Sequence, residues 1–175
     1  MKKFALLIMF ICALLVSGCD ISFNGSDNKD PKPVTDVKKD QSFVVYRASA
    51  DGTEKLLPEK ITVQDNGKAI EYNALVALCT TKPQDAKMDD IFPVGTKVLK
   101  LEVKDGIAYA DFSKEIKNAS KGSYNEMLIC YAIVNTLTEF KHIQKVQILV
   151  EGKKCITLNG HMDIEDPLKR NATLL

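Results

Sequence analysis

The strongest constraint in this sequence is an Asp-Gly pair, Asp105-Gly106, between two runs of alternating apolar and polar residues. A two-residue type I′ turn needs positive φ at both central positions, so this pair predicts a tight hairpin over residues 98–112. With that turn, apolar pairs share one face: Val103 with Ala108, Leu101 with Ala110 and Leu99 with Phe112. The other face pairs Lys104 with Ile107, Glu102 with Tyr109 and Lys100 with Asp111, the last as a favourable ion pair. A slip of one residue would break both patterns, so the register is well specified.

A long amphipathic helix is predicted after the hairpin. Ser123 and Glu126 fit a capping box, in which the serine hydroxyl accepts from the amide of residue 126 and the glutamate reaches back. An apolar stripe at helical spacing follows: Met127, Tyr131, Val134 and Leu137, flanked by Leu128, Cys130, Ile133 and Phe140. We expect the helix to end near residues 140–142 and a strand over residues 145–151 to follow it.

The remaining segments complete an α+β pattern. Strands are expected over residues 42–47 and 56–63, and Pro58 makes the second an edge strand or an interrupted strand. A short helix over residues 69–79 ends before Pro83, because the residue preceding a proline disfavours the α conformation. A further short strand is expected over residues 155–158. The order is βαββαβ, which predicts two helices packed on one face of a mostly antiparallel sheet, within one domain over residues 42–171.

The first 18 residues have the pattern of a bacterial lipoprotein signal peptide. Lys2 and Lys3 form a positive region, and the apolar run over residues 4–16 is too short to span a bilayer comfortably. It ends at Cys19 in a sequence that resembles a lipobox, with Val16 in place of the commoner Leu. We therefore expect lipidation of Cys19, with acyl chains such as palmitate, and anchoring at the extracytoplasmic face of the cell membrane. The alternative is an ordinary secretory leader followed by a chance cysteine.

Residues 19–41 are a predicted disordered tether, rich in Asn, Ser, Asp, Lys and Pro and poor in apolar residues. Without Lys2 and Lys3 the chain carries 22 basic and 23 acidic side chains, a net charge of −1. That balance gives no electrostatic footprint for nucleic acid.

Three cysteines remain beyond the leader and the lipidation site: Cys79, Cys130 and Cys155. Their odd number and irregular spacing argue against a disulfide framework or a zinc site. We interpret them as buried thiols, while a Cys79–Cys130 bridge stays open because both lie on predicted helices.

Five blocks of sequence, taken together, resemble the GerMN domain of bacterial sporulation and spore-germination proteins. They are residues 94–99, 103–115, 133–140, 146–153 and 160–163, and the resemblance extends over residues 43–171. The chain departs from the family at residues 81–83, where members often have Gly-Pro. The resemblance implies a non-enzymatic domain, often on a lipoprotein, whose topology is similar to that of ring-building modules of envelope channels. It implies no catalytic residues, and none can be carried over.

Several polar residues were weighed as candidate sites. His161, Asp163 and Glu165 could form a metal cluster, but His161 follows a turn, and bonding to nearby backbone is the preferred interpretation. His142 follows a helix end, where a cation complements the helix dipole. Ser113, Ser120 and Ser123 lack a partner base or nucleophile elbow, and Asp111 is interpreted as structural. Asn135 and Thr136 interrupt the apolar helix and could contact solvent or cap a neighbouring loop; solvent exposure is preferred, with a partner interface as a further alternative.

Two function hypotheses follow. The first is a lipid-anchored interaction module in envelope assembly, sporulation or germination, with an envelope protein as partner. Its candidate contact surface is the outer face of the hairpin: Lys100, Glu102, Ile107, Tyr109 and Asp111. The second is a protein that binds the cell wall or a small ligand, although the absence of Trp and the scattered Phe and Tyr reveal no aromatic groove. We expect no enzyme activity, cofactor, metal or nucleic-acid partner, and self-association stays open.

Overall fold

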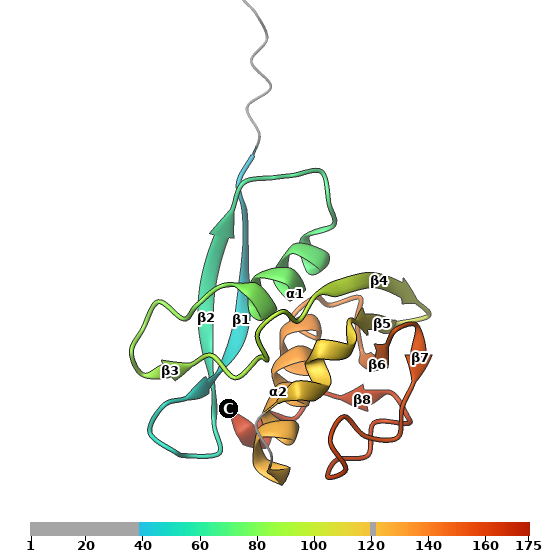
Figure 1. Ribbon diagram of the computed structural model, residues 1–175. Helices are drawn as coiled ribbons and strands as arrows, with labels where there is room; N and C mark the ends of the chain where they lie inside the picture. Colours follow the sequence, from blue (N-terminus) through green and yellow to red (C-terminus); the bar gives the residue numbers. More distant parts are fainter. Residues whose placement is uncertain (1–38, 120–121) are drawn as a thin grey trace, which may run out of the picture. The chain divides into compact units, whose positions relative to one another are not determined.

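The computed structural model describes residues 39–119 and 122–175 (Figure 1). The predicted leader, Cys19, the tether up to residue 38, and Ser120 lie outside these residues. In chain order the elements are β1 (Gln41–Ser49), β2 (Leu56–Val63), α1 (Ile70–Thr80), β3 (Met88–Asp89), β4 (Val98–Lys104), β5 (Ile107–Phe112), the 3-10 helix η1 (Lys114–Asn118), α2 (Ser123–Leu137), β6 (Lys145–Val150), β7 (Lys153–Lys154), β8 (Leu168–Lys169) and the 3-10 helix η2 (Ala172–Leu174).

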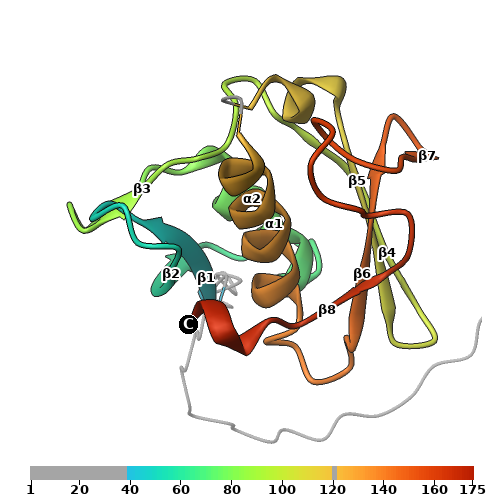
Figure 2. The ribbon, with the colours of Figure 1, turned by 90° about the horizontal axis from the view of Figure 1, so that it is seen from below.

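The strands form two sheets, and both helices lie between them (Figures 1 and 2). The three-stranded sheet has the antiparallel order β2-β1-β3. The five-stranded sheet has the order β4-β5-β6-β7, with β8 also on β6, and its β5–β6 pair is parallel. The predicted α+β fold with two helices is confirmed. It differs from the single sheet expected, because an alternating pattern identifies a strand but not its neighbours.

The hairpin of β4 and β5 has the predicted register at its turn end. Lys104 pairs with Ile107 and Leu101 with Ala110, and both turn residues have positive φ, 51° at Asp105 and 76° at Gly106. At the other end a bulge intervenes, and Val98 pairs with Phe112 instead of the predicted Leu99. Leu99 is the extra residue of the bulged strand and is 46% exposed.

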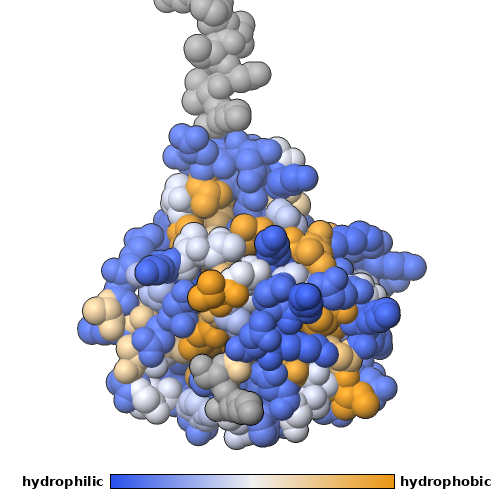
Figure 3. Space-filling model, in the orientation of Figure 1, coloured by the Kyte–Doolittle hydropathy of each residue, from blue (hydrophilic) through white to orange (hydrophobic). Residues whose placement is uncertain are grey.

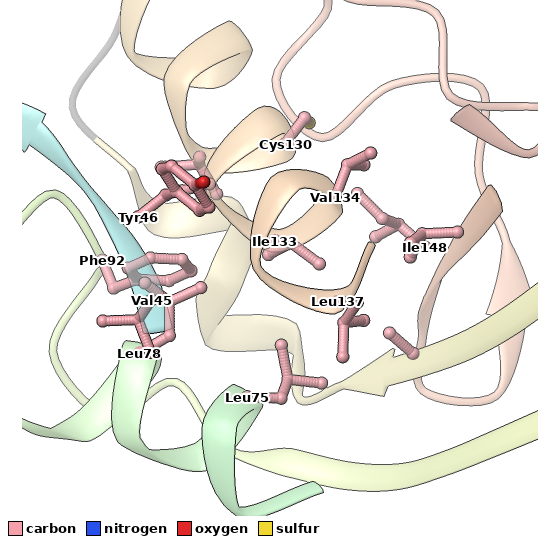
Figure 4. Packing of buried hydrophobic residues seen from close by; sticks show 14 of the residues in the cluster. Val45, Tyr46, Leu75, Leu78, Phe92, Cys130, Ile133, Val134, Leu137 and Ile148 are labelled. Atoms are coloured by element: carbon pink, nitrogen blue, oxygen red, sulfur yellow. The ribbon is translucent and has the colours of Figure 1, made fainter. Parts of the chain in front are cut away.

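Helix α2 is enclosed on most sides, because β1 contacts it from one sheet and β6 from the other. Ile133, Val134 and Leu137 of α2 pack among Val45 of β1, Leu75 and Leu78 of α1, and Ile148 of β6 (Figure 4). The helix ends at Leu137, three residues before the predicted end. The predicted capping box is wrong: Gly122 is the N-cap, Ser123 is the first helical residue, and no side chain caps the helix.

After β6 the chain pairs with the five-stranded sheet through β7 and β8 and then contacts β1 of the three-stranded sheet. Gly152, with φ of 73°, makes the turn into the two-residue strand β7. The strand predicted over residues 155–158 is wrong, because pairing with β6 ends at Lys154 and resumes only at β8. Residues 168–175, here called the C-terminal strap, then pass from β8 to η2, where Leu174 is buried. The ordered fold therefore continues past residue 171.

The other predicted elements agree with the structure within a few residues. Helix α1 ends at Thr80, before Pro83, and β2 with Pro58 is an edge strand. In α1, Leu75 and Leu78 are fully buried and Val76 is half-buried. Within the described ranges, no helix is both long enough and apolar enough to span a membrane.

Candidate functional site

Arg170 of the C-terminal strap joins three parts of the fold. Its Nη2 donates to the Tyr46 hydroxyl and to Glu139 Oε1, both at 2.6 Å, and its Nη1 donates to the Asn135 carbonyl at 2.9 Å. The Tyr46 hydroxyl donates to Glu139 Oε1 at 2.7 Å. Burial and the bond to Glu139 raise the pKa of Tyr46, so the phenol stays protonated as this donor. The strap is therefore fastened to β1 and to the end of α2.

Asn135 and Thr136 were expected in solvent, but both are fully buried. The Asn135 amide donates to the Asn171 carbonyl and accepts from the Asn171 N–H, each at 3.0 Å. Thr136 Oγ1 accepts from the N–H of Tyr46 at 3.0 Å. The expectation of solvent exposure is wrong because their partners lie on the strap and on β1, which a helical pattern cannot indicate. Since internal bonds occupy these side chains, they do not form a partner interface.

A buried cation, Arg47, closes the end of α1. Its Nε bonds Glu59 Oε2 at 2.9 Å, and its Nη1 donates to the Leu78 carbonyl at 2.7 Å. Glu59 Oε1 accepts from the N–H of Gln84 at 2.6 Å. These charges satisfy main-chain groups left open at the helix end, so they stabilise the fold and are not available for chemistry.

Glu126, expected in a capping box, instead binds the loop that follows β7. Its side chain is fully buried, and its two oxygens accept from the N–H groups of Leu158 at 2.8 Å and His161 at 3.0 Å. The loop is thereby held against the first turn of α2. Glu126 accepts from main-chain N–H groups, as a capping residue would, but these groups belong to a loop more than thirty residues away.

Beside this loop lies a groove of about 420 Å³ along the first turns of α2, here called the α2 groove. Tyr124, Met127 and Tyr131 of the helix and Met162 of the loop form its apolar part, and the polar lining is Glu54, Ser123 and His161. Met127 and Tyr131 belong to the stripe predicted to pack on a sheet, yet both are only half-buried. Apolar groups in the view of Figure 3 are small and separated by hydrophilic side chains. The groove, a concave and partly apolar feature, is the best candidate for binding.

The outer face of the hairpin, predicted as a contact surface, is polar and partly exposed. The predicted Lys100–Asp111 ion pair is absent: Lys100 bonds Glu102 at 2.6 Å, while Asp111 accepts from the N–H of Gly152 at 2.8 Å. The bond and charge of Lys100 lower the pKa of Glu102. Tyr109 and Ile107 are half-buried. Exposed charges along an edge strand protect a sheet against association, so this face is a weaker candidate than the α2 groove.

The candidate reactive residues lie apart from one another, and Ser113 among them is buried. The N–H of His161 bonds Glu126, and Asp163 Oδ1 accepts from the N–H of Glu165 at 2.9 Å. In the described part of the chain, no three His, Cys, Asp or Glu residues are grouped to hold a metal ion. His142 follows the end of α2, and its Nε2 lies 3.5 Å from Oε1 of Glu71 on α1. Ser113 Oγ accepts from the N–H of Lys97, which continues the β4–β5 ladder.

Cys79, Cys130 and Cys155 are free thiols, so the structure contains no Cys79–Cys130 bridge. Cys130 is buried in α2, and burial raises its pKa far above the ordinary thiol value. Burial raises the pKa of Cys79 and Cys155 as well. Cys130 therefore acts as a small apolar group, as the sequence suggested, whereas Cys79 and Cys155 are half-buried and not buried as predicted.

Comparison with known proteins identifies the family. The family model Germane, described as "Sporulation and spore germination", matches residues 44–155, more than half of the chain. The chain belongs to the Germane family. The match includes both helices and the strands from β1 to β7, apart from the first three residues of β1.

Relatives of known name agree with the Germane assignment. The chain is 28% identical over 193 residues to "Spore germination protein GerM" of Bacillus subtilis (strain 168), and the match covers 90% of this chain and 52% of that protein. It thus spans about half the length of this curated relative.

Solved Germane-related structures have the same fold. The tandem GerMN domains of the B. subtilis sporulation protein GerM match with a TM-score of 0.65 and 25% identity, over 75% of this chain and 46% of theirs. The first GerMN domain alone gives a TM-score of 0.63 at 25% identity, over 74% of this chain and 97% of that domain. A structure described as a putative lipoprotein from Clostridium perfringens gives 0.52 at 25% identity, over 79% and 93% of the two chains.

Proposed function

We propose that this chain is a lipid-anchored, extracytoplasmic Germane protein that acts in sporulation or spore germination through contacts with an envelope protein, without catalysis. The observation that carries the proposal is the family match over residues 44–155, which spans most of the folded domain. The bonded charges support a role without catalysis: the buried Arg47, Glu59 and Glu126 and the partly exposed Arg170 bond main-chain groups or one another. A charge that is bonded in this way stabilises the fold.

The proposed anchor is Cys19. The short apolar segment before it and the polar segment after it are typical of a lipoprotein, and two acyl chains suffice for stable membrane attachment. The tether would hold the domain at the extracytoplasmic face of the cell membrane.

A gene-replacement experiment in the source organism tests this function. Deletion should lower the yield of heat-resistant spores or slow their germination, and Cys19→Ala should release the protein from the membrane fraction and abolish palmitate labelling. Cys12→Ala, which changes a cysteine of the leader itself, should leave labelling intact. Normal spores after deletion would refute the role in sporulation, and unchanged labelling of Cys19→Ala would refute the anchor.

The alternative function is binding of a cell-wall component or a small ligand. It is favoured by one observation, the two tyrosines that line the α2 groove, because aromatic rings with polar tips suit amphipathic ligands. Retention of the full-length chain on purified peptidoglycan, lost in Tyr131→Ala, would support this alternative.

A further inference from the structure

We propose that the α2 groove is the docking site for the partner protein and that it takes an apolar segment of that partner flanked by basic side chains. This inference rests on the proposed function, since it names the surface and the chemistry of the contact. The α2 groove combines a hollow, an apolar lining and a lining tyrosine whose buried hydroxyl oxygen is unpaired among the described residues.

The lining favours a protein segment. Two tyrosines and two methionines supply the apolar part, and Tyr and Met are enriched at the centres of protein interfaces. Methionine side chains adapt to irregular apolar shapes because they are unbranched and polarisable. The volume of about 420 Å³ lies within the range of about 300–1,000 Å³ typical of binding sites.

Tyr124 supplies a specific hydrogen-bonding position. Its hydroxyl oxygen is buried and has no hydrogen-bond partner among residues 39–119 and 122–175. Buried polar groups are nearly always bonded, and an unmade bond costs about 1–3 kcal/mol. This oxygen is closed to solvent in the described structure, so Tyr124 has to rotate toward the groove before a carbonyl or N–H of a docked peptide can complete the bond.

The rim sets the charge of the partner. Glu54 lines the groove, is exposed and forms no ion pair within the described residues, and the exposed Asp163 directly follows the lining residue Met162. Lys55 is not among the lining residues, and its Nζ donates to the carbonyls of Thr173 and Leu175, at 2.8 and 3.2 Å. Among the lining side chains Glu54 carries the negative charge, and complementary charge on the partner would speed association and select the partner.

A carbohydrate fits the groove less well. A sugar carries a hydroxyl on most of its carbons and needs several polar partners, whereas the lining has three polar side chains, Glu54, Ser123 and His161, and the hydroxyl tips of two tyrosines. The two methionines provide no hydrogen-bonding match for such a ligand. A carbohydrate adduct is therefore one of the results that would contradict the proposal.

Photocrosslinking in cells tests the proposal. The full chain, produced in the source organism, carries p-benzoylphenylalanine in place of Met127 in the groove, or in place of Leu99, Ile156 or Val94 as exposed apolar controls. Mass spectrometry then locates the crosslinked residue in the adduct. We expect one protein adduct at least five-fold stronger from position 127 than from the controls, in a segment of apolar residues with Lys or Arg close by.

Charge variants make the test specific. Glu54→Lys should lower the adduct yield at least five-fold and Glu54→Gln should lower it less, while Asp89→Lys, the same reversal outside the groove, should not change it. Equal melting temperatures of the three variants verify folding, since both carboxylates are exposed and make no side-chain hydrogen bond in the described structure.

Each other outcome counts against the proposal. A glycan adduct, an acidic or wholly polar partner segment, or no response to Glu54→Lys would overturn it. Adducts from the control positions but not from position 127 would overturn the groove and leave the contact function standing. If no position gives an adduct and deletion leaves sporulation and germination normal, both the groove and the proposed function fail.

Discussion

Arg170 and Tyr46 lie 124 residues apart in the chain, and Arg170 Nη2 donates a hydrogen bond of 2.6 Å to the Tyr46 hydroxyl. The guanidinium carbon also lies 5.1 Å from the centroid of the Tyr46 ring, within the range of a cation–π contact. Because Arg170 follows β8 directly and Tyr46 lies in the middle of β1, this contact links the two sheets through the strap. The stability of the whole domain should therefore depend on it.

Arg170→Ala is expected to lower the free energy of unfolding by about 1–2 kcal/mol. Hydrogen bonds to a charged group contribute about 1.5–3 kcal/mol, and partial exposure of Arg170 and Glu139 reduces that value. Arg170→Lys should recover only part of the loss, because an ammonium lacks the forked geometry that reaches Tyr46 and Asn135 together. Urea denaturation measures the change, with the exposed neighbour Lys169→Ala as control. Equal midpoints for Arg170→Ala and the wild type would contradict the strap's role.

Arg47→Met should be more damaging, by about 3–5 kcal/mol, because it leaves Glu59 buried without its cation. The two side chains are 1% and 7% exposed, so solvent cannot replace the lost partner. Combining it with Glu59→Leu should cost at least 1 kcal/mol less than the two single changes added together, since contacting residues couple. A double-mutant cycle from urea midpoints measures this coupling, and simple additivity would show that the pair is not a unit.

Glu126→Gln is expected to loosen the loop after β7, because the amide offers one acceptor oxygen where the carboxylate offers two. One buried N–H then loses its partner, at a cost of about 1–3 kcal/mol. Hydrogen exchange should accelerate at the amides of Leu158 and His161. The amide of Ser113, which bonds the Lys97 carbonyl at 2.9 Å, serves as the reference in the same sample. Equal acceleration at all three amides would indicate global destabilisation and contradict a local role.

Asp51 should titrate well below an ordinary aspartate. Its Oδ1 accepts from Thr53 Oγ1 at 2.6 Å and from Ser49 Oγ at 2.7 Å, and these bonds lower its pKa to about 2. Because the folded-state pKa lies below the unfolded value of about 3.9, this contribution to stability is complete above pH 5. It is lost as the pH falls through about 2.

Thr53→Ala removes the strongest of these bonds and should move the pKa of Asp51 toward its usual value. NMR titration of the carboxyl carbon measures both proteins. The difference in melting temperature between wild type and variant should be constant above pH 5 and shrink toward pH 2. A wild-type pKa near 4 would rule out the bonded loop.

The features predicted correctly from the sequence are those that interactions between residues close in the chain determine. The register near Asp105-Gly106 follows from turn geometry and two-residue periodicity, and the structure has it at five cross-strand pairs from Lys100 to Lys104. The bulge at Leu99 lies beyond the reach of the turn. There the ladder continues from the Lys97 carbonyl to the N–H of Ser113, one residue out of step with the hairpin.

Long-range partners account for the remaining errors. Glu126, Asn135 and Thr136 each satisfy a local rule for caps or exposed helix positions, but they bond segments that lie 32 to 90 residues away. The α2 groove was missed for the same reason: Met127 and Tyr131 have the spacing of core residues, and only the position of the loop at Met162 leaves them accessible.

The parallel pairing of β5 with β6 has a consequence for how the chain is made. During synthesis from the amino end, the β4–β5 hairpin forms early because its contacts are close in sequence. The other edge of β5 stays unpaired until α2 and β6 have been synthesised. During that interval the growing polypeptide carries an open, apolar strand edge that other nascent chains could join. Slow translation through α2 would lengthen the interval, and aggregation during overproduction should originate there.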